Sequence, residues 1–126
     1  MSDIGVEDRL QYDPDTNTIF MDYSGMRVET TKDVDRIVAA VDNVLAPLDK
    51  KVNSIVNYDS FWVAPDVADH YLDAVRYVES TYYLKVSRYT TNGFMRIKLA
   101  RGLEERHISS RVVQTFAEAR DSLDSV

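Results

Sequence analysis

Polar side chains gather where two hydrophobic stretches of the chain end, and they are the best candidates for binding chemistry. An arginine beside the backbone amides that open a helix favours a bound carboxylate or phosphate. If the two stretches are neighbouring strands, these side chains share one rim. The alternative is structural, with Asn92 as a helix cap and Arg88 paired with Asp59. The candidate ligand-binding residues are Asn57, Tyr58, Asp59, Arg88, Thr90, Thr91 and Asn92.

Known catalytic motifs are absent from the sequence. The chain has four glycines, too widely spaced for a phosphate-binding loop. Ser60 precedes His70 by ten residues, but no GxSxG motif exposes the serine. His70 has acidic neighbours along the same predicted helix, which is common on a solvent-facing surface. We therefore predict no catalytic residue, no metal site and no cofactor, and an independent hydrolase or transferase is the remaining enzymatic alternative.

Two large aromatic side chains, Phe61 and Trp62, follow the first of these stretches. Aromatic side chains beside a loop are typical anchors for a partner protein. They are equally typical of a lid over the hydrophobic core. Both interpretations stay open at the level of sequence.

The elements that position these residues alternate between strand and helix. Asp8–Tyr12 and Asn17–Tyr23 flank the turn residues Asp13-Pro14-Asp15-Thr16 and predict a hairpin. Parallel strands joined by helices place their carboxyl ends on one edge. The expected fold is α/β, with a mixed, mostly parallel sheet of four or five strands and four helices. The later strands are expected at Val52–Tyr58, Leu84–Tyr89 and Arg111–Thr115.

Apolar spacing and capping residues predict the helices. The first begins after Thr30 or Thr31 and ends near Pro47. The second runs from about Pro65 to Tyr83. A third follows Asn92, and Thr115-Phe116-Ala117-Glu118 matches a capping box that opens the fourth. The apolar stripe expected to bury the third helix is Phe94, Ile97, Ala100 and Leu103.

Composition indicates one globular domain over residues 1–126, with residues 1–7 expected to be disordered. A net charge of -6 argues against nucleic-acid binding, and no apolar stretch is long enough for a membrane span. The absence of cysteine is compatible with the cytosol, and we expect a cytoplasmic protein. The charge is uneven, because residues 85–107 carry six Lys and Arg side chains against two Glu. This stretch is either a solvated helix face or a local site for an anion or partner.

The order of elements, a hairpin followed by repeated helix–strand units, resembles the STAS and SpoIIAA-like domains. These are small α/β modules named for sulfate transporters and anti-sigma-factor antagonists. The antagonists carry a phosphorylated Ser or Thr in a turn that opens a helix. Here that turn reads Ala64-Pro65-Asp66-Val67-Ala68, and Val67 at the acceptor position has no hydroxyl. The departure puts a phosphorylation switch in doubt, with Ser60 upstream as the alternative acceptor.

Short strings in the chain are also similar to the C-terminal segment of long acyl-CoA:acetate/3-ketoacid CoA-transferase-like proteins. They are Asp8-Arg9-Leu10, Tyr12-Asp13-Pro14, Val56-Asn57-Tyr58-Asp59 and Arg88-Tyr89-Thr90-Thr91. The resemblance implies an accessory domain attached to a catalytic body that carries the glutamate nucleophile.

We therefore expect a non-catalytic STAS-like interaction or regulatory module. Its partner is a separate protein, a covalently linked CoA-transferase body or a second copy of the chain. The alternative function is a sensor that binds a small molecule or anion at the strand-end rim.

Overall fold

The computed structural model describes residues 5–108 and 111–124, and these residues form an α/β fold built on a five-stranded sheet. The strand order is β1-β2-β4-β6-β7, with β1 antiparallel to β2 and the remaining neighbours parallel. This confirms the predicted fold class, including the mixed, mostly parallel sheet. The strands are β1 Leu10–Asp13, β2 Thr18–Asp22, β4 Val52–Asn57, β6 Tyr83–Tyr89 and β7 Val112–Val113.

The β1–β2 hairpin turns on the residues that the sequence marks as turn formers. Asp13 accepts hydrogen bonds from the Asp15 amide and the Thr16 hydroxyl, at 3.1 and 2.9 Å. Asn17 adopts a positive φ of 52°, a conformation that asparagine tolerates better than most residues. The Tyr12 hydroxyl donates to the Asn17 side chain at 2.6 Å and closes the turn.

Four α-helices connect or follow the strands, as predicted. The first is α1, whose N-cap Thr30 accepts from the Asp33 amide, while the Asp33 carboxylate accepts from the Thr30 amide. This capping box satisfies amides that have no partner within the helix. After α1 the chain continues as a 3-10 turn, η2, that contains Pro47. The helices are α1 Thr31–Leu45, η2 Ala46–Leu48, α2 Ala68–Tyr82, α3 Gly93–Glu105 and α4 Phe116–Asp124.

A second, two-stranded sheet pairs β3 (Arg27–Val28) with β5 (Trp62–Val63) in parallel. The sequence predicts neither strand, because two residues are too short for a periodic pattern. β3 follows the carboxyl end of β2, and β5 follows the carboxyl end of β4. The connecting segments also contact each other, because the Gly25 amide donates to Asp59 O at 2.8 Å. The small sheet therefore extends the carboxyl edge and fixes the segment that carries Trp62.

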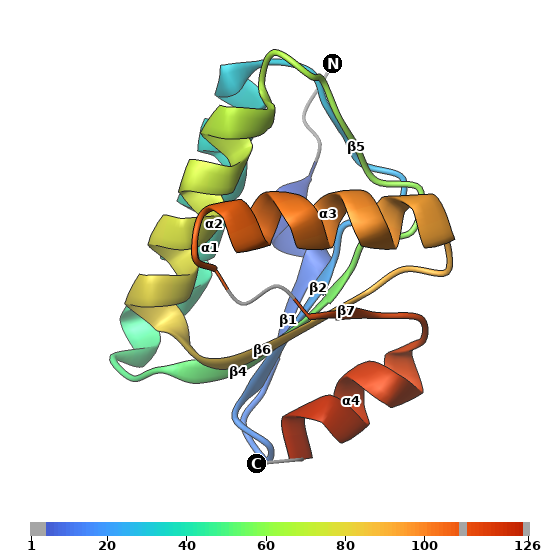
Figure 1. Cartoon of the computed structure of the whole chain (residues 1–126). Coiled ribbons are helices and arrows are strands. Elements are labelled where there is room, and N and C mark those ends of the chain that lie inside the picture. The colour runs from blue at the N-terminus through green and yellow to red at the C-terminus, as the bar shows by residue number, and fades with distance from the viewer. Residues whose placement is uncertain (1–4, 109–110, 125–126) are drawn as a thin grey trace.

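The helices cover the two faces of the main sheet unequally (Figure 1). Helices α1 and α2 pack side by side on one face, and α4 lies on the other against β6 and β4. Helix α3 crosses near β7 and contacts α2, where Arg106 bonds Asp69 and lies 3.6 Å from Asp73. The core lies between the sheet and the α1–α2 pair, and α4 leaves part of the opposite face open.

The expected disorder of residues 1–7 does not hold for residues 5–7. Val6 begins the short 3-10 helix η1 (Val6–Arg9), and its side chain is buried in the core cluster. Burial of this apolar side chain orders the backbone next to it. Residues 1–4 lie outside the described residues. Within the described ranges, no helix combines the length and apolar character needed to cross a lipid bilayer.

Candidate functional site

The ends of β4 and β6 lie side by side, as the sequence predicts. Asn57 and Tyr89 are register partners, and the Tyr58 amide donates to Tyr89 O at 2.9 Å. The loops that leave both strands therefore start at one edge of the sheet. This places Asp59 beside Thr90 and Thr91.

The Asp59 carboxylate occupies the position at the rim where the sequence predicts a bound anion. Its Oδ1 accepts hydrogen bonds from the Thr91 amide at 2.7 Å, the Thr90 hydroxyl at 3.0 Å and the Thr91 hydroxyl at 3.1 Å. These donors, led by the Thr91 amide, hold the pKa of Asp59 below its usual value. Asn92 accepts from the Met95 amide at 3.0 Å and so caps α3. The polar groups of this rim therefore satisfy one another.

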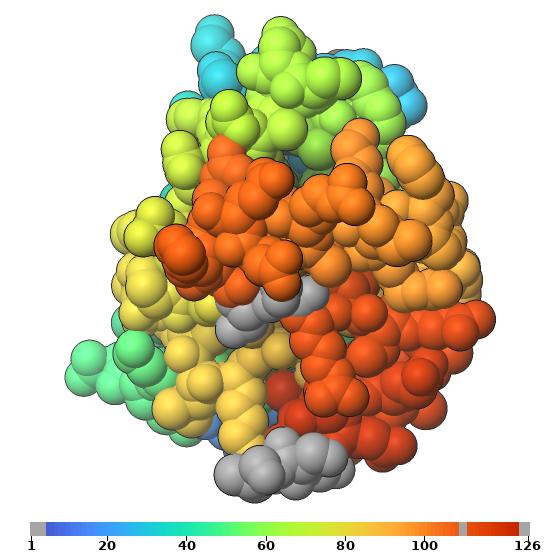
Figure 2. Space-filling model, viewed as in Figure 1, coloured from blue at the N-terminus to red at the C-terminus, as the bar shows by residue number. Residues whose placement is uncertain are grey.

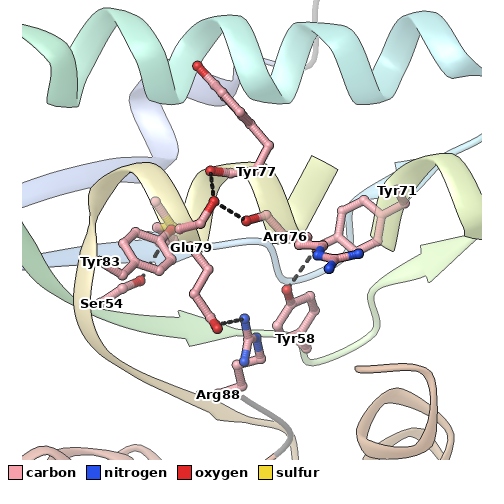
Figure 3. A network of polar contacts seen from close by, with 10 residues as sticks. Ser54, Tyr58, Tyr71, Arg76, Tyr77, Glu79, Tyr83 and Arg88 are labelled. Carbon is pink, nitrogen blue, oxygen red and sulfur yellow. Dashed lines mark hydrogen bonds and ion pairs between the residues drawn. The ribbon is translucent and has the colours of Figure 1, made fainter. Parts of the chain in front are cut away.

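Arg88 does not reach the rim, which corrects the prediction that it faces a ligand there. Its side chain is 1% exposed, and Nη2 donates to Glu79 on α2 at 3.1 Å (Figure 3). Side chains alternate along a strand, so Arg88 shares the face of its neighbour Val56 and points toward the helices. The alternative pairing with Asp59 is also wrong, because Glu79 supplies the carboxylate.

Tyr58 likewise points into the core. Its hydroxyl lies 2.8 Å from that of Tyr71, and Figure 3 shows both rings above Arg88. Burial, with further contributions from Tyr58 and Tyr23, raises the pKa of Tyr71, so its phenol stays protonated at neutral pH. A cavity of about 30 Å³ adjoins these groups, which is room for about one water molecule and not for a substrate.

The two aromatic residues after β4 have different roles. Phe61 is buried and packs against Tyr58 and Tyr71, with ring centroids 5.0 and 5.3 Å apart, so it belongs to the core. Trp62 is 38% exposed, and the Arg27 guanidinium lies 4.3 Å from its ring centroid. The sequence left both interpretations open, and the structure assigns Phe61 to the core and Trp62 to the surface.

An apolar groove of about 100 Å³ lies beside Trp62, between β5, the start of α2, and α3. Figure 2 shows the hollow between orange α3 and the green segment that contains β5. Lys98 is the one charged residue among the described residues that line it. Sequence reasoning found Phe61 and Trp62 but missed the residues that α2 and α3 supply to this groove. The principal apolar lining residues are Trp62, Val63, Leu72, Met95 and Leu99.

Of the stripe predicted to bury α3, Leu103 is buried, but Phe94 and Ile97 are not, so the helix is rotated from the predicted orientation. Phe94 and Ile97 are 76% and 63% exposed, whereas Leu99 and Leu103 are buried. The helix carries two overlapping apolar stripes, and the stripe through Leu99 and Leu103 packs inward. The other stripe leaves Phe94 and Ile97 on the surface. Apolar residues on two sides of one helix are a sequence pattern from which an exposed apolar surface could have been predicted.

The remaining enzymatic candidates are not brought into one site. His70 lies 3.1 Å from Asp35 of α1, on the exposed surface. Ser60 is exposed in the loop after β4, at a φ of 57°. In residues 5–108 and 111–124, no group of three or more His, Asp and Glu residues is placed to hold a metal ion.

No protein-family model, curated protein or solved structure gives a significant match to this chain. The geometry of the groove and the rim is therefore the basis on which a function is assigned.

Proposed function

We propose that this chain is a non-catalytic, STAS-like interaction module that holds a partner protein at the groove between β5 and α3. One observation carries the proposal: an apolar hollow lies at the surface beside a half-exposed tryptophan. Contiguous apolar surface of this kind is typical of protein contacts. Trp62 has the size and the indole donor of a residue that dominates such an interface.

The solvent-facing side of α3 is a second exposed apolar feature. Phe94 and Ile97 lie on this helix outside the lining of the groove, and both are mostly exposed. Leaving two large apolar side chains in water costs about 1.5–3 kcal/mol each relative to full burial. A partner that covers them recovers part of that free energy.

The charges around the groove favour an acidic partner. Lys98 lines the hollow, and Arg27 lies over the Trp62 ring. Of the six basic residues in segment 85–107, Arg88 is buried against Glu79 and Arg106 pairs with Asp69, whereas Lys98 lies in the lining itself. We therefore propose that the partner inserts an apolar side chain flanked by Asp or Glu.

The proposed accessory role rests on the resemblance to the C-terminal segment of CoA-transferase-like proteins. The order of a hairpin followed by parallel strands and helices supports the comparison with STAS-like modules. In this proposal the catalytic glutamate belongs to the partner body, and the module contributes binding.

The test is selection of binding peptides from a displayed library that tiles the proteome of the source organism. We expect enriched peptides to combine an aromatic or aliphatic residue with flanking acidic residues, and some to come from a CoA-transferase-like protein. Trp62→Ala and Lys98→Glu should each weaken binding of the enriched peptides by about tenfold or more. Leu84→Ala is the matched control, because Leu84 is exposed and apolar but lies outside the groove.

Two results would overturn the proposal. One is an enriched set without acidic character that binds all three variants as well as wild type. The other is sedimentation showing a stable dimer whose contact is lost in Trp62→Ala, because a second copy would then occupy the groove. Enrichment restricted to proteins unrelated to CoA-transferases would contradict the accessory role alone.

A further inference from the structure

A second and larger concavity lies on the sheet face that α1 and α2 do not cover. It opens between η1 and the start of α4 and has a volume of about 760 Å³. Its inner end is formed by Asp22, Asn57 and Tyr89, the last residues of β2, β4 and β6. They are register partners, so their side chains point to the same face. The carboxyl ends of parallel strands are a usual place for small ligands.

The floor and one wall of this cleft are aromatic. The Phe116 ring lies 6.1 Å from that of Phe20 and 5.9 Å from that of Tyr89. Ile55 of β4 lies between the strands that carry Phe20 and Tyr89, and its side chain is buried. Three rings on one wall form a surface that holds an apolar group and attracts a cation through the ring faces.

The charges of the cleft are acidic in balance. Asp8 and Asp22 line it against Arg9, whose Nη1 is held by the carbonyl oxygens of Asp22 and Ser24 at 2.9 Å each. Asp59 lies outside the lining, but its charge acts on the Tyr89 hydroxyl. Burial raises the pKa of the Tyr89 hydroxyl, and Asp22 and Asp59 raise it further. An anion placed here would meet these carboxylates, whereas a cation would be attracted.

Asp22 is oriented before any ligand arrives. Its Oδ1 accepts from the Ser24 backbone amide at 3.1 Å and the Ser24 hydroxyl at 2.5 Å, and lies 3.5 Å from the side-chain Nδ2 of Asn57. Among the described residues no donor contacts Oδ2. A fixed carboxylate with one oxygen available beside an aromatic wall fits an ammonium group.

We infer that this cleft binds a small organic cation, in which an amine contacts Asp22 and an attached apolar group packs on Phe20, Tyr89 and Phe116. The inference is independent of the groove beside Trp62, since the two sites share no lining residue. It also differs from an anion sensor at the rim, because the chemistry that recognises the ligand has the opposite charge.

Three probes that share a phenyl group but differ in charge test the inference. They are 2-phenylethylamine, 2-phenylethanol and phenylacetate, titrated into the ¹⁵N-labelled chain while backbone amide shifts are recorded. We expect the amine to shift the amides around Phe20, Asn57 and Tyr89 and to bind about tenfold more tightly than the alcohol. Phenylacetate should bind more weakly than either.

Asp22→Asn is the decisive variant, because asparagine keeps an oxygen for Ser24 and removes the charge. It should bring the amine down to the affinity of the alcohol, while Phe116→Ala should weaken both. Asp15→Asn removes a carboxylate from the exposed turn at the other end of the strands and should change nothing. Equal binding of amine and alcohol, unchanged binding in Asp22→Asn, or shifts confined to residues outside the cleft would each overturn the inference.

Discussion

Arg88 is the largest fully buried side chain among the described residues, and its environment explains why it is tolerated. A buried guanidinium costs several kcal/mol of desolvation unless charge and hydrogen bonds offset it. Burial lowers the pKa of Arg88, but Tyr58 and Glu79 more than offset this, so the net pKa lies above its usual value. The arginine therefore stays charged and ties β6 to α2. Its role is structural, and the sequence offered no sign of this because Glu79 lies on a different element.

At the rim, Asp59 makes the stability of the chain depend on pH. Its pKa is lowered by the Thr91 amide and by the hydroxyls of Thr90 and Thr91, so the folded state holds the charged form more strongly than the unfolded chain does. The stabilisation is fully present above the unfolded pKa, about 4. It is lost as the pH falls through the lower, folded pKa.

We expect Asp59→Asn to be less stable than wild type at neutral pH and to approach wild-type stability as the pH falls below about 4. The measurement is the free energy of unfolding in urea for both proteins between about pH 3 and pH 7. Asp66→Asn, which removes an exposed carboxylate in the turn before α2, controls for the change in net charge. A difference that stays constant across this range would contradict the assigned hydrogen bonds.

At the scale of elements, α3 shows where sequence reasoning succeeds and where it fails. Its start was predictable, because Asn92 is a strong capping residue and the cap is local. Its orientation was not, because the stripe through Phe94 and Ile97 and the stripe through Leu99 and Leu103 are similarly apolar. Contacts with α2 decide between them: Gly102 lets Leu72 approach so closely that an added Cβ would lie 3.1 Å from it.

This orientation predicts opposite outcomes for two truncations on one helix. Leu103→Ala should destabilise the chain by about 2–5 kcal/mol, because it leaves a cavity in the core. Ile97→Ala should change stability by no more than about 0.5 kcal/mol, because Ile97 is exposed. Urea unfolding of the two variants under the same conditions measures both. Equal destabilisation would mean that the originally predicted stripe is the buried one.

At the scale of the whole molecule, the main sheet could be predicted and the surfaces could not. Repeated apolar strands and capped helices encode the sheet locally, and the adjacency of β4 and β6 follows from parallel connections. The groove needs β5, which is two residues long, and the cleft needs α4 to cover one part of the sheet only. Both depend on contacts between distant segments, which single-sequence periodicity does not record.

The small β3–β5 sheet is joined to the main core, which predicts one cooperative unfolding transition. Val28 of β3 and Phe61 next to β5 belong to the same buried cluster as Met21 and Val56 of the main sheet. Trp62 is the chain's single tryptophan, so its fluorescence reports on β5, whereas far-UV circular dichroism reports on all helices and strands. We expect the two signals to give the same urea midpoint, since loss of the core would release β5 together with the sheet. A fluorescence midpoint clearly below the dichroism midpoint would show that the groove segment unfolds first. In that case the groove would not be preformed, and a partner would bind it only at the added cost of ordering it.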